Sequence, residues 1–266
     1  MALQSSGQIT LDDIHVEAGG TTGTQASIND ADIRGLISAT SGSEMQFSDW
    51  YNASSSASFV GSYTREISES DALHYIDSST PIDVTTAGVQ VGDLVVIAIS
   101  SDFALSADAT FTGMTLTNLA GTTQTDAPGR ILQYGFWQSG DSNPYVSSYT
   151  NGGRPAAVVA AVFRNTNTSI LNSGVSSGSF GMPDPPSLAS VAGTKIIIAS
   201  GHLDDDNVTM TAGSGYTLAG SIGATRGATA CSTGIQYKIT STSTTENPPV
   251  FGGGGNDQNV AFSLRF

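Results

Sequence analysis

Basic residues are scarce in this sequence. The 266 residues include 9 Lys and Arg against 23 Asp and Glu, for a net charge of -14. Binding to nucleic acid phosphates or to anionic membrane surfaces depends on clustered Lys and Arg, so both kinds of partner are disfavoured. The longest strongly apolar block, Leu94–Ile99, is far shorter than the ~20 residues that span a bilayer, so we expect no membrane insertion.

Cysteine and histidine are also scarce. The single cysteine, Cys231, cannot form an intramolecular disulfide, and a zinc site would have to draw its other ligands from a chain with only three His. The first residues have neither a basic start nor an apolar stretch, so no secretory signal is predicted. We therefore expect assembly in a cytoplasm, no cofactor, and stability from packing.

Charged residues make up only 12%, where about a quarter is usual, and Gly, Ser, Thr and Asn take their place. From Phe59 onward, short blocks of Val, Ile, Phe and Tyr alternate with turn residues, and no long amphipathic helix lies between them. This pattern predicts an all-β fold, an antiparallel β-sandwich or jelly roll. Strands are predicted near Leu94–Ser100, Arg130–Gln138, Ala156–Arg164, Lys195–Ser200, Gly234–Thr240 and Val260–Phe266. The continuously apolar blocks indicate strands that are covered on both faces.

A weak internal repeat runs through this β-rich region at a spacing of 101 to 104 residues. It pairs Val95–Ala98 with Ile196–Ala199, and Gly92-Asp93 with Gly193-Thr194. Two related half-units, roughly 81–164 and 186–266, are therefore predicted. They could both contribute strands to one sandwich or form two adjacent small sheets, and the sequence does not decide between these arrangements.

Residues 1 to 52 have a different pattern, with two possible short helices. Thr10 is positioned to cap a helix that carries Leu11 and Ile14, and Ser27 to open one that carries Ile33, Leu36 and Ile37. Isolated helices shorter than about 12 residues are not stable in water, so this segment is expected to become ordered only against another surface. We place an N-terminal docking segment and linker at 1–56 and a β-sandwich domain at 57–266.

Catalytic motifs are weak. Gly174-Val-Ser176-Ser-Gly178 matches the Gly-x-Ser-x-Gly motif of a nucleophile elbow. That motif needs an apolar strand before it and a helix after it, and the sequence predicts neither. A flexible connector is predicted here instead. Asp204–Asp206 lacks the glycine-turned loop of a calcium site and is interpreted as a solvated acidic loop. No enzymatic activity is predicted. Glu66, Glu69 and Asp71 form a local acidic group, but local spacing does not indicate the opposed carboxylates that a glycosidase needs. His15, His74 and His202 are scattered and form no pair at metal-ligand spacing.

Aromatic residues gather in one part of the sequence. Core packing is the favoured interpretation, because aromatics at alternate strand positions usually divide between core and sheet edge. The alternative is a surface on which sugar rings stack. The residues concerned are Tyr134, Phe136, Trp137, Tyr145 and Tyr149.

Several motifs resemble those of known virion proteins. Leu3-Gln-Ser-Ser-Gly-Gln-Ile9, Leu11-Asp-Asp-Ile14, Gly19-Gly20 and Phe47-Ser-Asp-Trp-Tyr51 resemble the docking segment at the start of many virion-associated proteins of tailed phages, especially marine and cyanobacterial ones. Asp12, Asp13 and His15 depart from that pattern. The later blocks look like a β-rich domain of phage tail and other surface proteins; they are Gly92–Val96, Gly215–Leu218, Gln236–Lys238 and Val260–Phe266.

The resemblance implies a structural component of a tailed-phage virion, most simply a tail fibre or baseplate-associated protein, assembled in the host cytoplasm. Its partners would be other virion proteins of the tail, baseplate or capsid, and a homo-oligomer is expected, a trimer in the case of a fibre. Alternatives are a capsid decoration protein and a host-glycan-binding module or depolymerase. The residues predicted to dock on the virion are Leu3, Ile9, Leu11, Ile14, Ile33, Leu36, Phe47, Trp50 and Tyr51.

Overall fold

The computed structural model of the chain divides into two compact units. The N-terminal unit spans Met1–Ala57 and the sandwich unit spans Ser58–Phe266. The residues that the structure describes are 3–4, 7–37, 39, 41–50, 56–67, 79–101, 111–119, 129–146 and 155–266. Within these ranges, no helix is both long and apolar enough to cross a membrane.

Three short helices form the N-terminal unit: α1 (Leu11–Glu17), α2 (Ala31–Gly35) and the 3-10 helix η1 (Phe47–Trp50). Helix α1 starts where the sequence predicts. The Thr10 hydroxyl accepts a hydrogen bond from the Asp13 backbone N–H at 3.1 Å, and the Asp13 carboxylate accepts one from the Thr10 N–H at 2.8 Å. This reciprocal capping box satisfies two backbone donors that the first turn would otherwise leave unpaired.

Helix α2 differs from its prediction in both start and end. It begins at Ala31 with Asp30 as the N-cap residue, and it ends at Gly35, so Leu36 and Ile37 lie beyond it. Ser27 instead opens a turn that precedes the helix: its backbone N–H donates to Asp30 Oδ2 at 2.8 Å. Because Asn and Asp side chains bond readily to nearby backbone, a capping signal at this position is also a turn signal.

The N-terminal unit has a hydrophobic core of its own. Ile9, Ile14, Ile33 and Trp50 are buried, and Leu3, Leu11 and Leu36 are among the partly buried residues packed around them. The Trp50 indole N–H donates to the Ile33 carbonyl at 3.0 Å. The prediction that this segment becomes ordered only against another surface is therefore wrong. It considered each helix alone, whereas Trp50 gives separate short elements a shared surface to pack on.

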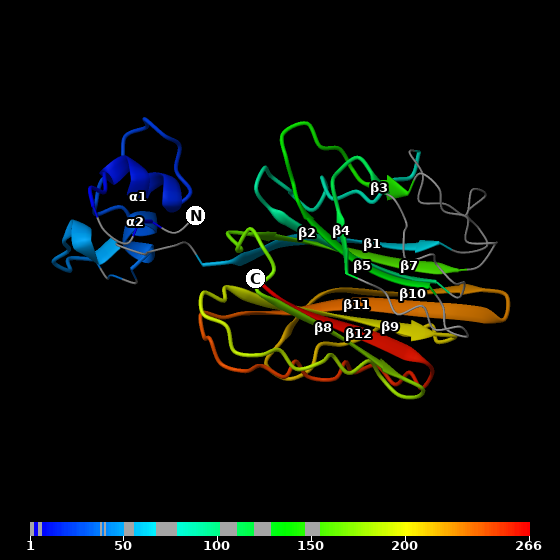
Figure 1. The fold of residues 1–266 in the computed structure, drawn as a ribbon. Helices are drawn as coiled ribbons and strands as arrows, with labels where there is room; N and C mark the ends of the chain where they lie inside the picture. Colours follow the sequence, from blue (N-terminus) through cyan, green and yellow to red (C-terminus); the bar gives the residue numbers. More distant parts are fainter. Residues whose placement is uncertain are drawn as a thin grey trace. The chain divides into compact units, whose positions relative to one another are not determined.

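Two antiparallel five-stranded sheets form the sandwich unit, as predicted (Figure 1). The first sheet has the order β1 (Ser58–Ile67), β7 (Ala156–Arg164), β2 (Leu94–Ser101), β5 (Gly129–Phe136) and β4 (Thr117–Leu119). The second has the order β10 (Thr217–Arg226), β11 (Thr229–Ile239), β9 (Ile196–Asp204), β12 (Asn259–Arg265) and β8 (Asn172–Gly178). A small additional sheet pairs β3 (Phe111–Thr112) with β6 (Tyr145–Val146).

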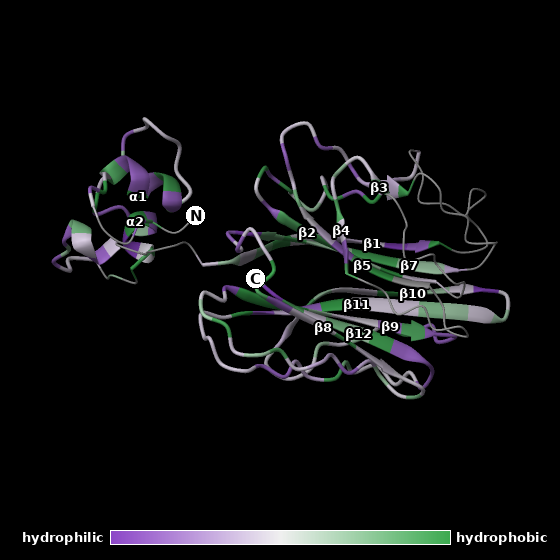
Figure 2. Ribbon diagram, viewed as in Figure 1, coloured by the Kyte–Doolittle hydropathy of each residue, from purple (hydrophilic) through white to green (hydrophobic). Residues whose placement is uncertain are grey.

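The central strands of both sheets are covered on both faces, which explains their continuous apolar sequences. Every residue of β2, β9 and β12 is buried, and Figure 2 shows hydrophobic colouring along these strands. On its outer face the first sheet packs against a core that includes Ile82 and Trp137. The outer face of the second sheet packs against Met210 and Phe251.

The two half-units of the sequence repeat correspond to the two sheets. Starting from the edge strand that comes first in the chain, the first sheet has the order β1-β7-β2-β5-β4 and the second β8-β12-β9-β11-β10, which is the same topology. Gly92 and Gly193, which precede β2 and β9, both adopt positive φ, at 92° and 80°. Each sheet contains one predicted half-unit together with an edge strand that lies before its expected start, β1 in the first sheet and β8 in the second. The half-units therefore form the two sheets of a single sandwich, and each is longer than the sequence repeat indicates.

The predicted strands are all present, but others were not foreseen. The Gly174–Gly178 string is not a flexible connector, because it lies in the edge strand β8, where Ser176 pairs with Ala261 of β12. Gly and Ser have low strand propensity. Backbone pairing with a buried neighbouring strand overrides that propensity, and such a partner cannot be identified from the local sequence.

Candidate functional site

The structure brings the predicted docking residues together as a core and not as a contact surface. Ile9, Ile14, Ile33 and Trp50 are buried within the N-terminal unit, so a folded unit cannot offer them to a partner. Leu3, Leu11 and Leu36 are partly buried against that core. Tyr51 lies outside the described residues. The assignment of the buried four as docking residues is therefore corrected.

Two large apolar side chains are accessible among the described residues of the N-terminal unit. Val16 of α1 is 43% exposed and Phe47 of η1 is 45% exposed. The Phe47 ring lies 6.4 Å from the Trp50 ring, so it is held against the core while presenting its other side to solvent. The sequence of residues 1 to 57 carries seven acidic residues and a single basic one, Arg34. This unit therefore has an acidic composition and isolated apolar side chains that are accessible to solvent.

Ser176 and His202, which were considered as catalytic candidates from the sequence, make contacts within the fold. The Ser176 hydroxyl donates to the Asp184 carbonyl at 2.5 Å, and no helix follows it. His202 is buried between strands, within 3.3 Å of the hydroxyls of Ser200 and Thr233. Glu69, Asp71 and His74 lie outside the described residues. Among the residues that are described, no group of three His, Cys, Asp or Glu side chains could hold a metal ion.

The acidic loop is only partly solvated. Asp204 is buried at the end of β9, and Asp205 is exposed with a positive φ of 42°. The Asp206 carboxylate accepts a hydrogen bond from the Asn256 N–H at 2.7 Å. These carboxylates therefore terminate a strand and fix a neighbouring loop, in contrast to the fully solvated loop that the sequence predicts.

One strongly perturbed group lies on the outer side of the second sheet. Burial, together with the nearby Glu246 carboxylate, raises the pKa of Tyr216 far above its usual value. Tyr216 donates to Glu246 at 3.2 Å, and Lys238 bonds the same carboxylate at 2.9 and 3.0 Å. The phenol of Tyr216 therefore stays neutral and donates its proton to the Glu246 carboxylate in a hydrogen bond. This cluster fixes the loop that carries Glu246, and the neutral phenol is not a general base.

The predicted aromatic cluster divides between two environments. Trp137 belongs to the outer core of the first sheet and Tyr145 packs against it, as the core interpretation predicts. Tyr134 and Phe136 lie on the other face of β5, which ends just before Trp137, and they are only partly buried. Strand alternation separates them, since residues two apart share a face. Tyr149 lies outside the described residues.

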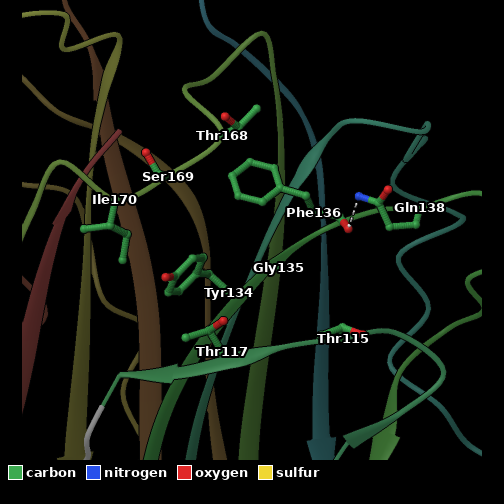
Figure 3. Close-up of a pocket in the computed structure, with 9 residues that line it drawn as sticks. All are labelled: Thr115, Thr117, Tyr134, Gly135, Phe136, Gln138, Thr168, Ser169 and Ile170. Atoms are coloured by element: carbon green, nitrogen blue, oxygen red, sulfur yellow. Dashed lines mark hydrogen bonds between the residues drawn. The ribbon is translucent and has the colours of Figure 1, made fainter.

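A pocket of about 520 Å³ opens at the side chains of Tyr134 and Phe136 (Figure 3). It lies between strands β4 and β5 and the segment that connects β7 to β8. Its remaining lining residues are neutral: Thr115, Thr117, Gly135, Gln138, Thr168, Ser169 and Ile170. Pockets of this size fall within the range of about 300–1,000 Å³ that is typical of small-molecule sites.

The rings of Tyr134 and Phe136 pack against a buried aromatic ring of the second sheet's C-terminal end. The buried Phe266 ring meets Tyr134 at 5.5 Å and Phe136 at 6.2 Å, in both cases edge to face. The Gln138 side-chain amide donates to the Phe136 carbonyl at 3.0 Å, as Figure 3 shows. Sequence reasoning had identified the two aromatics but not Thr115, Thr168 or Phe266, which only the sheet order brings to them.

Gly135 lets the backbone at Thr115 approach β5 closely, and both residues line the pocket. A Cβ at this position would lie 2.2 Å from the Thr115 carbonyl oxygen. We expect Gly135→Ala to lower the free energy of unfolding by about 1–3 kcal/mol, the usual cost of overpacking. The measurement is chemical denaturation of the full chain. Gly35→Ala is the matched control, because its Cβ would meet nothing within 4 Å. An unchanged Gly135→Ala midpoint would contradict this account.

The pocket supplies aromatic faces, hydroxyls and an amide, but no carboxylate, imidazole or amine. Such groups bind and orient a neutral molecule; they do not form an acid–base pair of the kind that general catalysis uses. Comparison of the chain with protein-family models, curated proteins and solved structures gave no match.

Proposed function

We propose that this chain is a structural component of a tailed-phage virion, a tail fibre or baseplate-associated protein. In this proposal the N-terminal unit attaches the sandwich unit to other virion proteins. One observation carries it: the motifs that resemble virion docking segments all lie in a separate compact unit that ends at Ala57. A small unit joined to a larger β-sandwich suits a protein whose two ends have different partners.

Attachment in this proposal uses the outer surface of a folded unit. Ile14, Ile33 and Trp50 are buried inside it, which leaves Val16 and Phe47 as its accessible large apolar side chains among the described residues. The surrounding acidic charge favours a neutral or basic surface on the partner, since complementary charges guide and select an interface. Several copies would be arranged around a symmetry axis of the particle, as closed homo-oligomers usually are.

Incorporation into particles tests the proposal. Three chains are compared in cells that supply the other virion proteins encoded by the same genome: the full chain, residues 58–266, and residues 1–57 fused to a fluorescent protein. We expect the full chain and the fusion to enter purified particles and residues 58–266 to remain outside. Incorporation of the sandwich unit alone, or exclusion of the fusion, would contradict the proposal.

A single substitution refines the same test. Phe47→Asp places a charge at the exposed ring, and we expect incorporation of the full chain to fall at least tenfold while the fold is retained. Ile239→Asp is the matched control, because Ile239 is similarly exposed but belongs to the sandwich unit. The readout is the amount of each variant per particle, with circular dichroism to check folding. Equal incorporation of both variants would argue against attachment through Phe47.

A further inference from the structure

We propose that the pocket at Tyr134 and Phe136 binds the ring of a neutral saccharide. The argument is that, among the described residues, no aromatic ring stacks on Tyr134 in the way that one stacks on the matching tyrosine at the opposite edge. That the saccharide belongs to a host surface rests on the proposed function. The binding itself does not, and it can be measured on the purified chain.

The comparison begins with two tyrosines in matching places. Tyr134 of β5 and Tyr237 of β11 each follow a glutamine in the internal repeat, and their strands occupy the same position in the two sheets. Each meets a phenylalanine of the facing sheet edge to face. Phe266 lies 5.5 Å from Tyr134 at an interplanar angle of 70°, and Phe163 lies 5.4 Å from Tyr237 at 69°. The two environments are therefore closely equivalent on this side.

The second neighbour of each tyrosine differs. Tyr237 is covered by the Phe59 ring, which stacks on it at 5.1 Å and 21°. Phe59 comes from the edge strand β1, where it pairs with Phe163. At the other edge, the chain entering β8 runs beside the C-terminus, with the Leu171 N–H bonded to the Arg265 carbonyl at 2.8 Å. There the aliphatic Ile170, and not an aromatic ring, lines the pocket with Tyr134.

The contacts between the two sheets also differ at the two edges of the sandwich. Strand β1 lies along β10, where the Ser62 hydroxyl donates to the Ala219 carbonyl at 2.7 Å. The backbone is close enough there that a Cβ on Gly220 would lie 3.1 Å from Val159. At the opposite edge β4 is only three residues long, and within the described residues it makes no such extended contact with β8. The pocket occupies this second edge, where the described strands of the two sheets contact each other less.

The lining of the pocket indicates the class of ligand. A pyranose ring has an apolar face of C–H groups that packs on aromatic rings, here Tyr134 and Phe136, and a rim of hydroxyls that needs hydrogen-bonding partners. Thr115, Thr117, Thr168, Ser169 and Gln138 provide such partners. The absence of cationic side chains from this lining, with the net charge of -14, disfavours phosphates and acidic sugars. An aromatic peptide side chain would fill the space but leave the hydroxyls unpaired.

Binding is tested by isothermal titration and saturation-transfer NMR on the full chain. The probes are the methyl pyranosides of glucose, galactose, mannose and N-acetylglucosamine. We expect at least one to bind, with saturation transferred most strongly to the C–H face of its ring. Tyr134→Leu should weaken that binding at least tenfold, and Thr168→Val should weaken it several-fold. Phe180→Ala is the matched control, because this ring is 77% exposed but lies outside the pocket.

A fourth variant separates loss of binding from loss of folding. Ile170→Phe supplies the ring that the other edge has in Phe59, so it should abolish binding while leaving the thermal midpoint unchanged or higher. No binding of any probe by the folded chain overturns the proposal, as does weakening by Phe180→Ala with none by Tyr134→Leu. Tighter binding of N-acetyltryptophanamide than of every saccharide would overturn it in favour of a peptide ligand. None of these outcomes depends on incorporation into particles.

Discussion

Arg164→Met is expected to lower the free energy of unfolding of the sandwich unit by about 3 kcal/mol, at the lower end for breaking a buried ion pair. The guanidinium bonds both oxygens of Asp93, with Nε to Oδ1 at 2.9 Å and a terminal nitrogen to Oδ2 at 2.8 Å. The Asp93 side chain is 2% exposed and that of Arg164 34%. The partial exposure of the arginine is the reason for taking the lower end.

The cost comes from the carboxylate that remains. Without Arg164, the buried Asp93 carboxylate keeps one of its described hydrogen bonds, from the Gln90 N–H at 2.8 Å. The hydrogen bonds to Asp93 raise the pKa of Arg164 above its ordinary value, so the guanidinium keeps its positive charge. Urea denaturation at neutral pH should show a lower midpoint with an unchanged slope.

The second sheet supplies the control. Arg265 is also buried, but it bonds the Thr194 hydroxyl at 3.2 Å and the Thr244 carbonyl at 2.9 Å, and its Nε has no partner. Thr194 stands where the repeat has Asp93 in the first half. Arg265→Met removes a buried charge without stranding a carboxylate, so we expect a change within about 1 kcal/mol. Equal losses in the two variants would show that the ion pair is not the cause.

Much of the sandwich could be predicted from the sequence because its central strands are buried on both faces. Val, Ile and Ala then occur without interruption, as in β2 and β9, and such blocks are visible in the sequence. The edge strands could not be predicted in this way. Strand β8 is made of Gly, Ser, Asn and one Val, and its identity as a strand depends on pairing with β12, which lies about 90 residues away in the sequence.

The sites were harder to predict than the fold. Apolar residues in positions 1 to 52 were visible, but their spacing does not reveal whether they contact a partner or one another. The bond from the Trp50 indole to the Ile33 carbonyl decides that question across 17 residues of chain. In the same way, the aromatic pair Tyr134 and Phe136 was noticed, but the hydroxyls of Thr115 and Thr168 reach it only through the order of the strands.

Trp50→Ala is expected to unfold the N-terminal unit and leave the sandwich unit intact. Removing a fully buried aromatic side chain costs about 3–5 kcal/mol. A unit of fewer than 60 residues is only marginally stable, because it buries about 60% of the surface of its unfolded chain. The loss should therefore exceed what holds residues 1 to 57 together. In two-dimensional NMR of the amide groups, the signals of this unit should collapse to unfolded positions while those of β2, β7, β9 and β12 stay in place.

Phe47→Ala is the matched control, because it removes an aromatic ring that is 45% exposed on the same helix as Trp50. We expect it to cost less than about 1 kcal/mol and to leave the NMR signals of the unit dispersed. Comparing Trp50→Ala with Phe47→Asp separates a core residue from a contact residue. Trp50→Ala should abolish attachment by unfolding the unit, whereas Phe47→Asp should reduce it at least tenfold in a folded chain. If Trp50→Ala left the N-terminal signals unchanged, the order of the unit would not depend on the core around Trp50.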